Sequence, residues 1–465
     1  MALPELIEII PLSQPVRAEI SVPGSKSITN RALILAALAD GEVMLNGALW
    51  SEDTQVMVEC LQELGFMVNV DADPAEPCNR TITVYGDGGR VPPGGTTAQP
   101  LDLFVSNAGT AARFLAPFLC LGSGVYRLHG VPRMHQRPQA ALFSALRELG
   151  YTVESEAGND KLPVRIFGSR PEGIIGADTP IRGVVKACEV SIEESSQFAS
   201  ALMLSAKAGG WKIGVLGDNA DESPYVTMTA RLLESFPPRG GSFQIEPDAS
   251  SGSYFWAAGW LTYALEIQAK AKRTGKWSGS PVYVKNWPDS GWQIDADFPD
   301  FLPFPEEISR EGQLGDSIMT AITLSAEEQA ADSRGLLENH PCIRFTDLGR
   351  LRLQECERVV ALRTELTKCG AKLIEEGNSL TVWPLSLHGA EIETYNDHRM
   401  AMCFAVLGLK VPGIKIKNPA CVKKTFPNFF QKLAAPPPQG LGAEIWEITG
   451  GKRRRKLSGD DLFAD

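Results

Sequence analysis

Lys26, Ser27 and Arg31 together offer a grip for a phosphate or carboxylate group near the start of the chain. Small residues at 23–25 precede them, which predicts that a helix begins here and that Arg31 lies one turn beyond Ser27 on the same face. The spacing of a phosphate-binding P-loop is absent, because Ser25 rather than glycine precedes the lysine. A solvated helix face would carry the same residue types, so both interpretations stay open.

Two further segments in this half carry residues suited to anion binding. Gly109 lies in a predicted helix start rich in small side chains (107–113), where backbone N–H groups can approach a ligand closely. Arg133 and Arg137 follow in a loop flanked by prolines. Arginine in a stiff loop suits bidentate recognition of carboxylate or phosphate.

The second half of the chain adds carboxylates to the cations. Glu355 and Arg358 lie one turn apart in a predicted helix, where a plain ion pair is the alternative to a site. Other polar residues at predicted helix starts in this half are Asp316, Asp397, His398, Arg399, Lys423 and Lys424. Such cations and acids predict an enzyme that acts on two phosphorylated or carboxylated small molecules by acid–base chemistry. The sequence offers no metal-binding constellation and no Ser-His-Asp or Cys-His arrangement, so we expect neither a metal nor a cofactor.

These residues belong to a pattern that recurs six times along the chain. In each copy, small or polar residues open an apolar stretch with helical character. The copies begin at Gly24, Ser106, Glu194, Asp248, Gly315 and Asn396. Several copies are followed by a second helix, a turn and a strand, which indicates an α/β architecture of stacked similar units. The N–H groups at each helix start attract anions, although Ser, Asp and Asn there can equally act as simple helix caps.

The chain of 465 residues is long enough for two large domains. Hydrophobic residues make up 43%, and the net charge of −11 argues against a nucleic-acid or membrane partner. The start of the chain has no basic cluster, and no apolar run reaches the roughly 18 residues that span a bilayer. Nine cysteines are scattered without a CxxC pair, so we expect reduced thiols in a cytoplasmic protein. Prolines and glycines after Ala434 predict that residues 434–465 form a flexible C-terminal tail.

Seven sequence blocks, taken in order, resemble a known enzyme family. They are PGSKSITNRAL, NAGTAAR, PRMHQRP, SSQF, DASSGSYF, TYNDHRMAM and KKTFP, spread over residues 22–433. They are similar to the signature blocks of the 5-enolpyruvylshikimate-3-phosphate synthases, which are enolpyruvyl transferases. The resemblance implies a two-domain inside-out α/β barrel built from six βαβαββ-like repeats. It implies a discontinuous first domain of residues 1–21 and 248–433 and a second domain of residues 22–247.

The resemblance also implies a reaction and roles for residues. Members transfer the enolpyruvyl group of phosphoenolpyruvate to the 5-hydroxyl of shikimate 3-phosphate and release phosphate, a step in aromatic amino acid biosynthesis. Lys26, Asp316 and Glu355 are implied to be catalytic: Asp316 takes the hydroxyl proton, and Glu355 with Lys26 moves a proton to and from the methylene carbon. The residues implied to bind phosphoenolpyruvate are Lys26, Gly109, Arg137, Arg358, Arg399 and Lys424. Those implied to bind shikimate 3-phosphate are Lys26, Ser27, Arg31, Ser195, Ser196, Gln197, Tyr225 and Asp316.

These two small molecules are the partners that the resemblance implies, and we expect no nucleic acid, no membrane and a monomer. The family pattern is not met everywhere. The departures are Gln354 where a lysine is usual, Glu222 where a serine is usual, Phe114 where a proline is usual, and residues 262–314, whose Trp- and Pro-rich sequence predicts a reshaped repeat unit.

Two alternative functions stay open. A UDP-N-acetylglucosamine enolpyruvyl transferase typically carries a cysteine in the loop before the equivalent of Arg137, and this loop has none. The departures keep open a catalytically weak homologue that binds shikimate 3-phosphate without turnover. Retention of Lys26, Asp316, Glu355 and Arg399 together favours an active enzyme.

Overall fold

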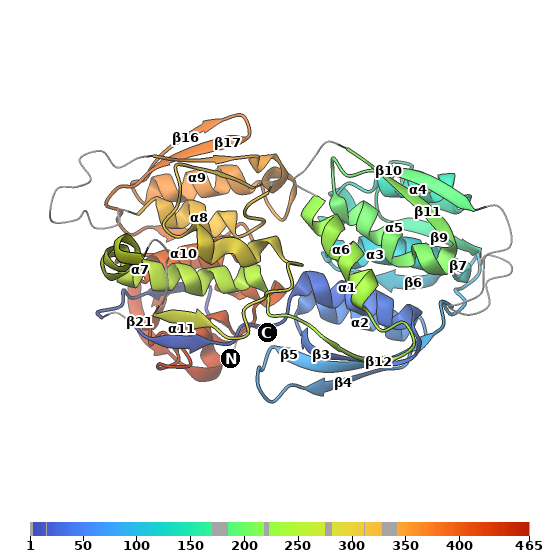
Figure 1. Cartoon of the computed structure of the whole chain (residues 1–465), viewed down its shortest axis with the longest axis horizontal. Helices are drawn as coiled ribbons and strands as arrows, with labels where there is room; N and C mark the ends of the chain where they lie inside the picture. Colours follow the sequence, from blue (N-terminus) through green and yellow to red (C-terminus); the bar gives the residue numbers. More distant parts are fainter. Residues whose placement is uncertain are drawn as a thin grey trace. The chain divides into compact units, whose positions relative to one another are not determined.

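The computed structural model describes residues 3–14, 16–169, 185–217, 223–274, 281–310, 312–327 and 342–464. The chain divides into two compact units (Figure 1). We call Met1–Val22 with Pro247–Asp465 the terminal unit and Pro23–Glu246 the central unit. Both units mix helices and strands, which confirms the α/β class expected from the sequence. Within the described residues, no helix is both long and apolar enough to cross a membrane.

The central unit is built from helices that alternate with short sheets. Its helices are α1 (Lys26–Leu38), α2 (Glu52–Glu63), α3 (Gly109–Cys120), α4 (Ala140–Glu148), α5 (Ser196–Gly209) and α6 (Ser223–Ser235), with the 3-10 helix η1 (Met134–Gln136). Its strands are β3 (Asp40–Leu49), β4 (Val68–Ala72), β5 (Asn79–Asp87), β6 (Leu101–Phe104), β7 (Ser123–His129), β8 (Thr152–Ser155), β9 (Val164–Ser169), β10 (Lys186–Ser191), β11 (Trp211–Leu216) and β12 (Gly241–Gln244). The strand orders of its sheets are β12-β3-β5-β4, β6-β7-β9-β8 and β10-β11.

Three helices form the core of the central unit. Helices α1, α3 and α5 pack against one another, and each also packs against its own sheet: α1 on β3 and β5, α3 on β7 and β9, and α5 on β10 and β11. Every residue of α3 is buried. A helix that is covered on all sides is largely apolar all round, and the polar side chains of Thr110 and Arg113 take part in hydrogen bonds.

The terminal unit contains the remaining elements. Its helices are α7 (Ala249–Thr274), α8 (Ile318–Ser325), α9 (Arg358–Lys368), α10 (His398–Gly408) and α11 (Phe429–Ala434), with the 3-10 helices η3 (Ile294–Phe301), η4 (Leu348–Leu353), η5 (Pro419–Lys424) and η6 (Gly459–Leu462). Its strands are β1 (Leu6–Ile9), β2 (Ala18–Ile20), β13 (Val282–Val284), β14 (Glu307–Ser309), β15 (Ile343–Thr346), β16 (Lys372–Glu376), β17 (Ser379–Trp383), β18 (Glu391–Ile392), β19 (Lys415–Lys417), β20 (Ile445–Thr449) and β21 (Lys452–Leu457). They form sheets in the orders β18-β19-β1-β20-β21, β13-β2 and β14-β15-β17-β16.

The same packing principle holds in the terminal unit. Helices α7, α8 and α10 contact one another, and they contact β13, β17 and β19 respectively. In the four-stranded sheet β14-β15-β17-β16, a parallel pair is followed by two antiparallel pairings, as in the two four-stranded sheets of the central unit. All residues of α8 are buried, so the helix that follows Asp316 lies in the core.

Residues 434–464 are part of the fold, so the expectation of a flexible C-terminal tail is wrong. Strand β20 pairs antiparallel with β1 on one side and with β21 on the other. Ile445, Leu457 and Leu462 are at most 1% exposed, which anchors both strands and η6 in the core. Strand β21 carries a run of basic residues, and acids of the same sheet pair with it: Arg453 pairs with Glu8 at 2.8 Å.

The sequence predicts a reshaped repeat unit for residues 262–314, and this segment contributes strand β13 to a small sheet. Strand β13 pairs with β2 alone, in a two-stranded parallel sheet. Between β13 and β14 the chain forms the 3-10 helix η3, which contains Pro299 and could not be a regular α-helix there. Residues 275–280 and 311 of this segment lie outside the described part.

Candidate functional site

The N-terminal turns of α1, α3 and α5 are tied together in the central unit by side-chain hydrogen bonds. One bond joins each pair of helices: Asn30 Nδ2 donates to Thr110 Oγ1 (2.8 Å), Arg31 Nη2 to Ser200 Oγ (3.1 Å) and Arg113 Nη1 to Gln197 Oε1 (2.7 Å). Three helix starts therefore lie close together. The positive ends of their dipoles favour a negative ligand at this place.

Arg31 is a buried cation with neutral partners. The residue is 1% exposed, its Nε donates to Thr229 Oγ1 at 2.8 Å, and its Nη1 donates to the Ser27 carbonyl at 2.9 Å. Its guanidinium also lies 5.1 Å from the centre of the Phe114 ring. Burial lowers the pKa of Arg31 to about 10, which a nearby Tyr225 hydroxyl opposes. Among the described residues no carboxylate pairs with this guanidinium, so its charge is available to an anionic ligand.

Gly109 and Arg137 form a second part of the central cluster. Arg137 Nη1 donates to the Asn107 carbonyl at 3.2 Å, just before α3 begins. A Cβ atom on Gly109 would lie 2.7–2.8 Å from the Arg137 guanidinium. The glycine therefore lets the arginine lie directly against the start of α3.

The remaining predicted residues of this unit lie at the starts of α1, α5 and α6. Lys26 Nζ pairs with Asp53 Oδ2 at 3.1 Å, an acid that the sequence did not single out. Ser195 caps α5, since its Oγ accepts from the Gln197 N–H at 3.2 Å. Ser196 is buried and Tyr225 half-buried. The departure at Glu222 lies outside the described residues.

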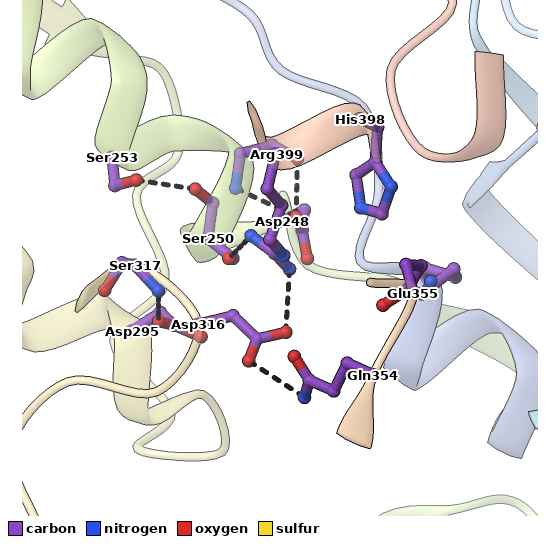
Figure 2. A network of polar contacts seen from close by, with 12 residues as sticks. Asp248, Ser250, Ser253, Asp295, Asp316, Ser317, Gln354, Glu355, His398 and Arg399 are labelled. Carbon is purple, nitrogen blue, oxygen red and sulfur yellow. Dashed lines mark hydrogen bonds and ion pairs between the residues drawn. The ribbon is translucent and has the colours of Figure 1, made fainter. Parts of the chain in front are cut away.

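Asp316 is the centre of the polar cluster in the terminal unit, and its two carboxylate oxygens have different donors. Oδ1 accepts from Arg310 Nη2 at 3.2 Å and from Gln354 Nε2 at 3.4 Å. Oδ2 pairs with Arg399 Nη2 at 3.2 Å and with Arg358 Nη1 at 3.8 Å. Figure 2 shows Arg399 at one oxygen and Gln354 at the other.

The charges around Asp316 control its proton affinity. Burial alone would raise the pKa of Asp316, but the positive charges of Arg399, Arg358 and Arg310 together outweigh burial and hold this pKa well below its usual range. Conversely, burial and the charge of Asp316 raise the pKa of the buried Asp295 to about 6. Asp295 Oδ1 accepts from the Ser317 N–H at 2.7 Å, which fixes the backbone next to Asp316.

Glu355 lies between two cations. Its Oε1 pairs with Lys424 Nζ at 3.1 Å, and its Oε2 pairs with Arg358 Nη2 at 2.8 Å. The side chains of Glu355 and Lys424 are 13% and 10% exposed, so both are shielded but within reach of a small ligand.

Asp397 joins the start of α10 to Arg358. Its carboxylate accepts from Arg358 Nε at 2.6 Å and Nη2 at 3.2 Å, and also caps the helix by accepting from the Arg399 N–H at 2.9 Å. Arg399 Nη1 also donates to Ser250 Oγ near the start of α7 (Figure 2).

The structure brings Asp316, Glu355, Arg358, Arg399 and Lys424 together in one polar cluster. Two carboxylates surrounded by buried cations can exchange protons with a ligand whose anionic groups those cations hold. The residues that the sequence reasoning missed here are Arg310 and Asp295. No group of three or more metal-ligating side chains occurs among the described residues.

The family model described as EPSP synthase (3-phosphoshikimate 1-carboxyvinyltransferase) matches residues 11–239 and 316–433. The chain belongs to the EPSP synthase family. Among its relatives, the 3-phosphoshikimate 1-carboxyvinyltransferase of Nostoc sp. is 35% identical, with 92% of this chain and 99% of the relative covered. The enzyme of that name from Opitutus terrae is 36% identical, with 93% and 98% covered.

Solved structures share the fold of this EPSP synthase family member. The EPSP synthase of Acinetobacter baumannii superposes with a TM-score of 0.64 at 19% identity, over 95% of this chain and 100% of that one. The enolpyruvyl transferase NikO of Streptomyces tendae gives a TM-score of 0.58 at 16% identity, over 95% and 98%. The family model leaves residues 240–315 unmatched, and this stretch contains Arg310 and Asp295.

Proposed function

We propose that the chain transfers the enolpyruvyl group of phosphoenolpyruvate to the 5-hydroxyl of shikimate 3-phosphate and releases phosphate. The observation that carries the proposal is the similarity along almost the whole chain to relatives named 3-phosphoshikimate 1-carboxyvinyltransferase. The cluster around Asp316 supports an active enzyme rather than a binding homologue, because it joins two carboxylates to cations.

In the central unit, the cluster at the starts of α1, α3 and α5 suits a phosphorylated and carboxylated ligand. We assign shikimate 3-phosphate to Ser27, Arg31, Ser195, Ser196, Gln197 and Tyr225, together with Lys26. Arg31 supports this assignment, since it is a buried cation with only neutral partners among the described residues. We assign phosphoenolpyruvate to Gly109, Arg137 and Lys26, where a guanidinium lies against a helix start.

In the terminal unit, Arg358, Arg399 and Lys424 are assigned to phosphoenolpyruvate, and Asp316 and Glu355 to proton transfer. The 5-hydroxyl oxygen bonds to C2 of phosphoenolpyruvate, its proton passes to Asp316, and Glu355 delivers a proton to the methylene carbon. The C2–O bond to phosphate then breaks with its electron pair on the phosphate, and Glu355 removes a proton from the methyl group. We also assign Lys26 a part in both proton transfers, as the resemblance implies.

Electrostatic stabilisation is expected to supply much of the rate. Negative charge moves onto the leaving phosphate during the reaction, and buried cations at fixed positions stabilise it without reorganising. The pairs Lys424–Glu355 and Arg399–Asp316 hold these cations in place. In the same pairs, Glu355 and Asp316 lie next to the cations Lys424 and Arg399, whose positive charge an anionic substrate would partly neutralise.

We also propose the finer architecture implied by the resemblance: a two-domain inside-out α/β barrel built from six βαβαββ-like repeats, with one domain made of both ends of the chain. Support comes from the central position of α1, α3 and α5 in one unit and of α7, α8 and α10 in the other. The shared pairing pattern of the four-stranded sheets supports it as well.

The deciding experiment mixes the pure protein with phosphoenolpyruvate and measures released phosphate, with and without shikimate 3-phosphate. We expect release only when both are present. Release with UDP-N-acetylglucosamine in place of shikimate 3-phosphate would assign the chain to the sister reaction. Saturable binding of shikimate 3-phosphate without any release would identify a homologue that lacks turnover.

A further inference from the structure

Arg310 is a buried cation that directly contacts the proposed proton acceptor. The residue is 2% exposed and follows β14. Its Nη2 donates to Asp316 Oδ1 at 3.2 Å. A buried charge is costly unless it is paired, so this contact has a large influence on both side chains.

Gln354 reaches the same oxygen of Asp316 with a neutral group. Its Nε2 lies 3.4 Å from Oδ1, while its Oε1 accepts from Arg358 Nη1. The resemblance described above implies a lysine at this position, and the neutral amide of Gln354 brings no charge to Oδ1 from that side. Arg352, a nearby arginine of η4, is no substitute, because it pairs with Glu357 and Glu375.

The other oxygen of Asp316 faces the two arginines assigned to phosphoenolpyruvate. Arg399 lies at 3.2 Å and Arg358 at 3.8 Å from Oδ2. An anionic substrate held by these arginines competes with Oδ2 for them. Oδ2 is thus the oxygen that substrate binding can release to accept a proton, whereas Oδ1 stays held by Arg310 and Gln354.

We propose that Arg310 is a positioning residue that supplies the positive charge missing at position 354, holding Oδ1 of Asp316 so that Oδ2 accepts the hydroxyl proton. This inference deepens the proposed function and rests on it for the role of Asp316. The contact between Arg310 and Asp316 also affects the stability of the folded protein, so part of the test can be done without measuring turnover.

A double-mutant cycle tests the exchange of charge between positions 310 and 354. It compares the wild type, Arg310→Gln, Gln354→Lys and the double variant by their melting temperature, kcat and the KM of both substrates. Arg344→Gln is the matched control, because Arg344 lies in β15, next to β14, and its side chain is 49% exposed and pairs with Glu307. We expect this control to equal the wild type in every measurement.

We expect Arg310→Gln to lower kcat on the order of tenfold to a hundredfold, as a misplaced reacting group does, with each KM changed by no more than about threefold. Its melting temperature should fall too. In the Arg310→Gln background, Gln354→Lys should recover about tenfold in kcat and part of the lost melting temperature, because the ammonium group replaces the lost charge at Oδ1. A loss of packing alone would not be repaired by a cation introduced at another position.

Gln354→Lys alone should bring no gain, since Arg310 already occupies Oδ1 and Arg358 repels a second cation. If this single variant raises kcat about tenfold, or lowers the KM for phosphoenolpyruvate about tenfold, the proposal is overturned, even if Arg310→Gln does not fold. Equal values for Arg310→Gln and the double variant would also overturn it. A wild type that releases no phosphate refutes the proposed function instead, and the melting temperatures of the cycle then decide whether Arg310 replaces the charge at position 354.

Discussion

Replacing Asp397 by asparagine should strongly destabilise the terminal unit, although the two side chains have nearly the same shape. Asp397 and Arg358 form a fully buried ion pair, with side chains 0% and 1% exposed. In Asp397→Asn the guanidinium loses its charged partner and faces an amide, while the asparagine oxygen can still accept from the Arg399 N–H and cap α10. The change therefore removes the buried charge and the hydrogen bond from Arg358 Nε to Oδ2, and leaves the cap in place.

The size of the effect follows from what remains around Arg358. Removing one partner of a buried ion pair costs about 3–5 kcal/mol. Arg358 keeps Glu355 at 2.8 Å and Asp316 at 3.8 Å, so we expect the lower end, about 3 kcal/mol. For a unit of this size that corresponds to a melting temperature lower by roughly 6–12 °C. Asp397→Ala should lose about 1 kcal/mol more, because the cap is lost as well.

Unfolding followed by tryptophan fluorescence can measure this loss in the right unit. Of the nine tryptophans, only Trp50 and Trp211 lie in the central unit. The control is Glu307→Gln, which breaks an ion pair whose side chains are 49% and 59% exposed and should cost no more than about 0.5 kcal/mol. If Asp397→Asn loses no more than this control, the idea that a buried Arg358–Asp397 pair supports the cluster is refuted.

Three further predictions concern single residues. Asp316→Ala should lower kcat by about a hundredfold or more in the phosphate-release assay, as expected for a lost general base, and near-normal turnover would remove Asp316 from that role. Gly109→Ala should raise the KM for phosphoenolpyruvate by about tenfold with little change in melting temperature, since its Cβ displaces the flexible end of Arg137. Asp295→Asn should raise the free energy of unfolding by about 1–3 kcal/mol above pH 6. Because the pKa of Asp295 is raised to about 6 in the folded protein, its ionisation destabilises the fold above that pH. Below its unfolded pKa the residue is protonated in both states and costs no stability. Melting curves at several pH values test it, and an equal gain at acid pH would contradict it; the amide oxygen can keep the bond from Ser317.

Much of the candidate site could be predicted from the sequence because its residues recur at the starts of helices. Asp316 precedes α8, His398 and Arg399 open α10, and Lys26 opens α1. A cluster of small or polar residues before an apolar stretch is a local signal, and helix starts of neighbouring repeats come together when the helices pack side by side.

Contacts between distant or irregular segments could not be predicted in this way. The C-terminal strands β20 and β21 join β1 at the other end of the chain, and prolines before them gave the composition of a linker. Arg310 lies only six residues before Asp316, yet it sits outside any helix or strand, where no periodic pattern fixes the direction of a side chain. Asp53 was missed because the acids that open α2 look like ordinary helix-start residues.

The pairing of cations with acids within each unit has a chemical consequence that residue types alone do not reveal. Arg399 pairs with Asp316, Lys424 with Glu355 and Lys26 with Asp53. An anionic substrate must therefore take these cations from carboxylates. As it does so, Asp316 loses part of the positive charge that holds its pKa well below the usual range, and its proton affinity rises. In the reaction proposed above, Asp316 therefore becomes a stronger base when phosphoenolpyruvate binds to Arg358 and Arg399. Substrate binding and activation of the base become one event.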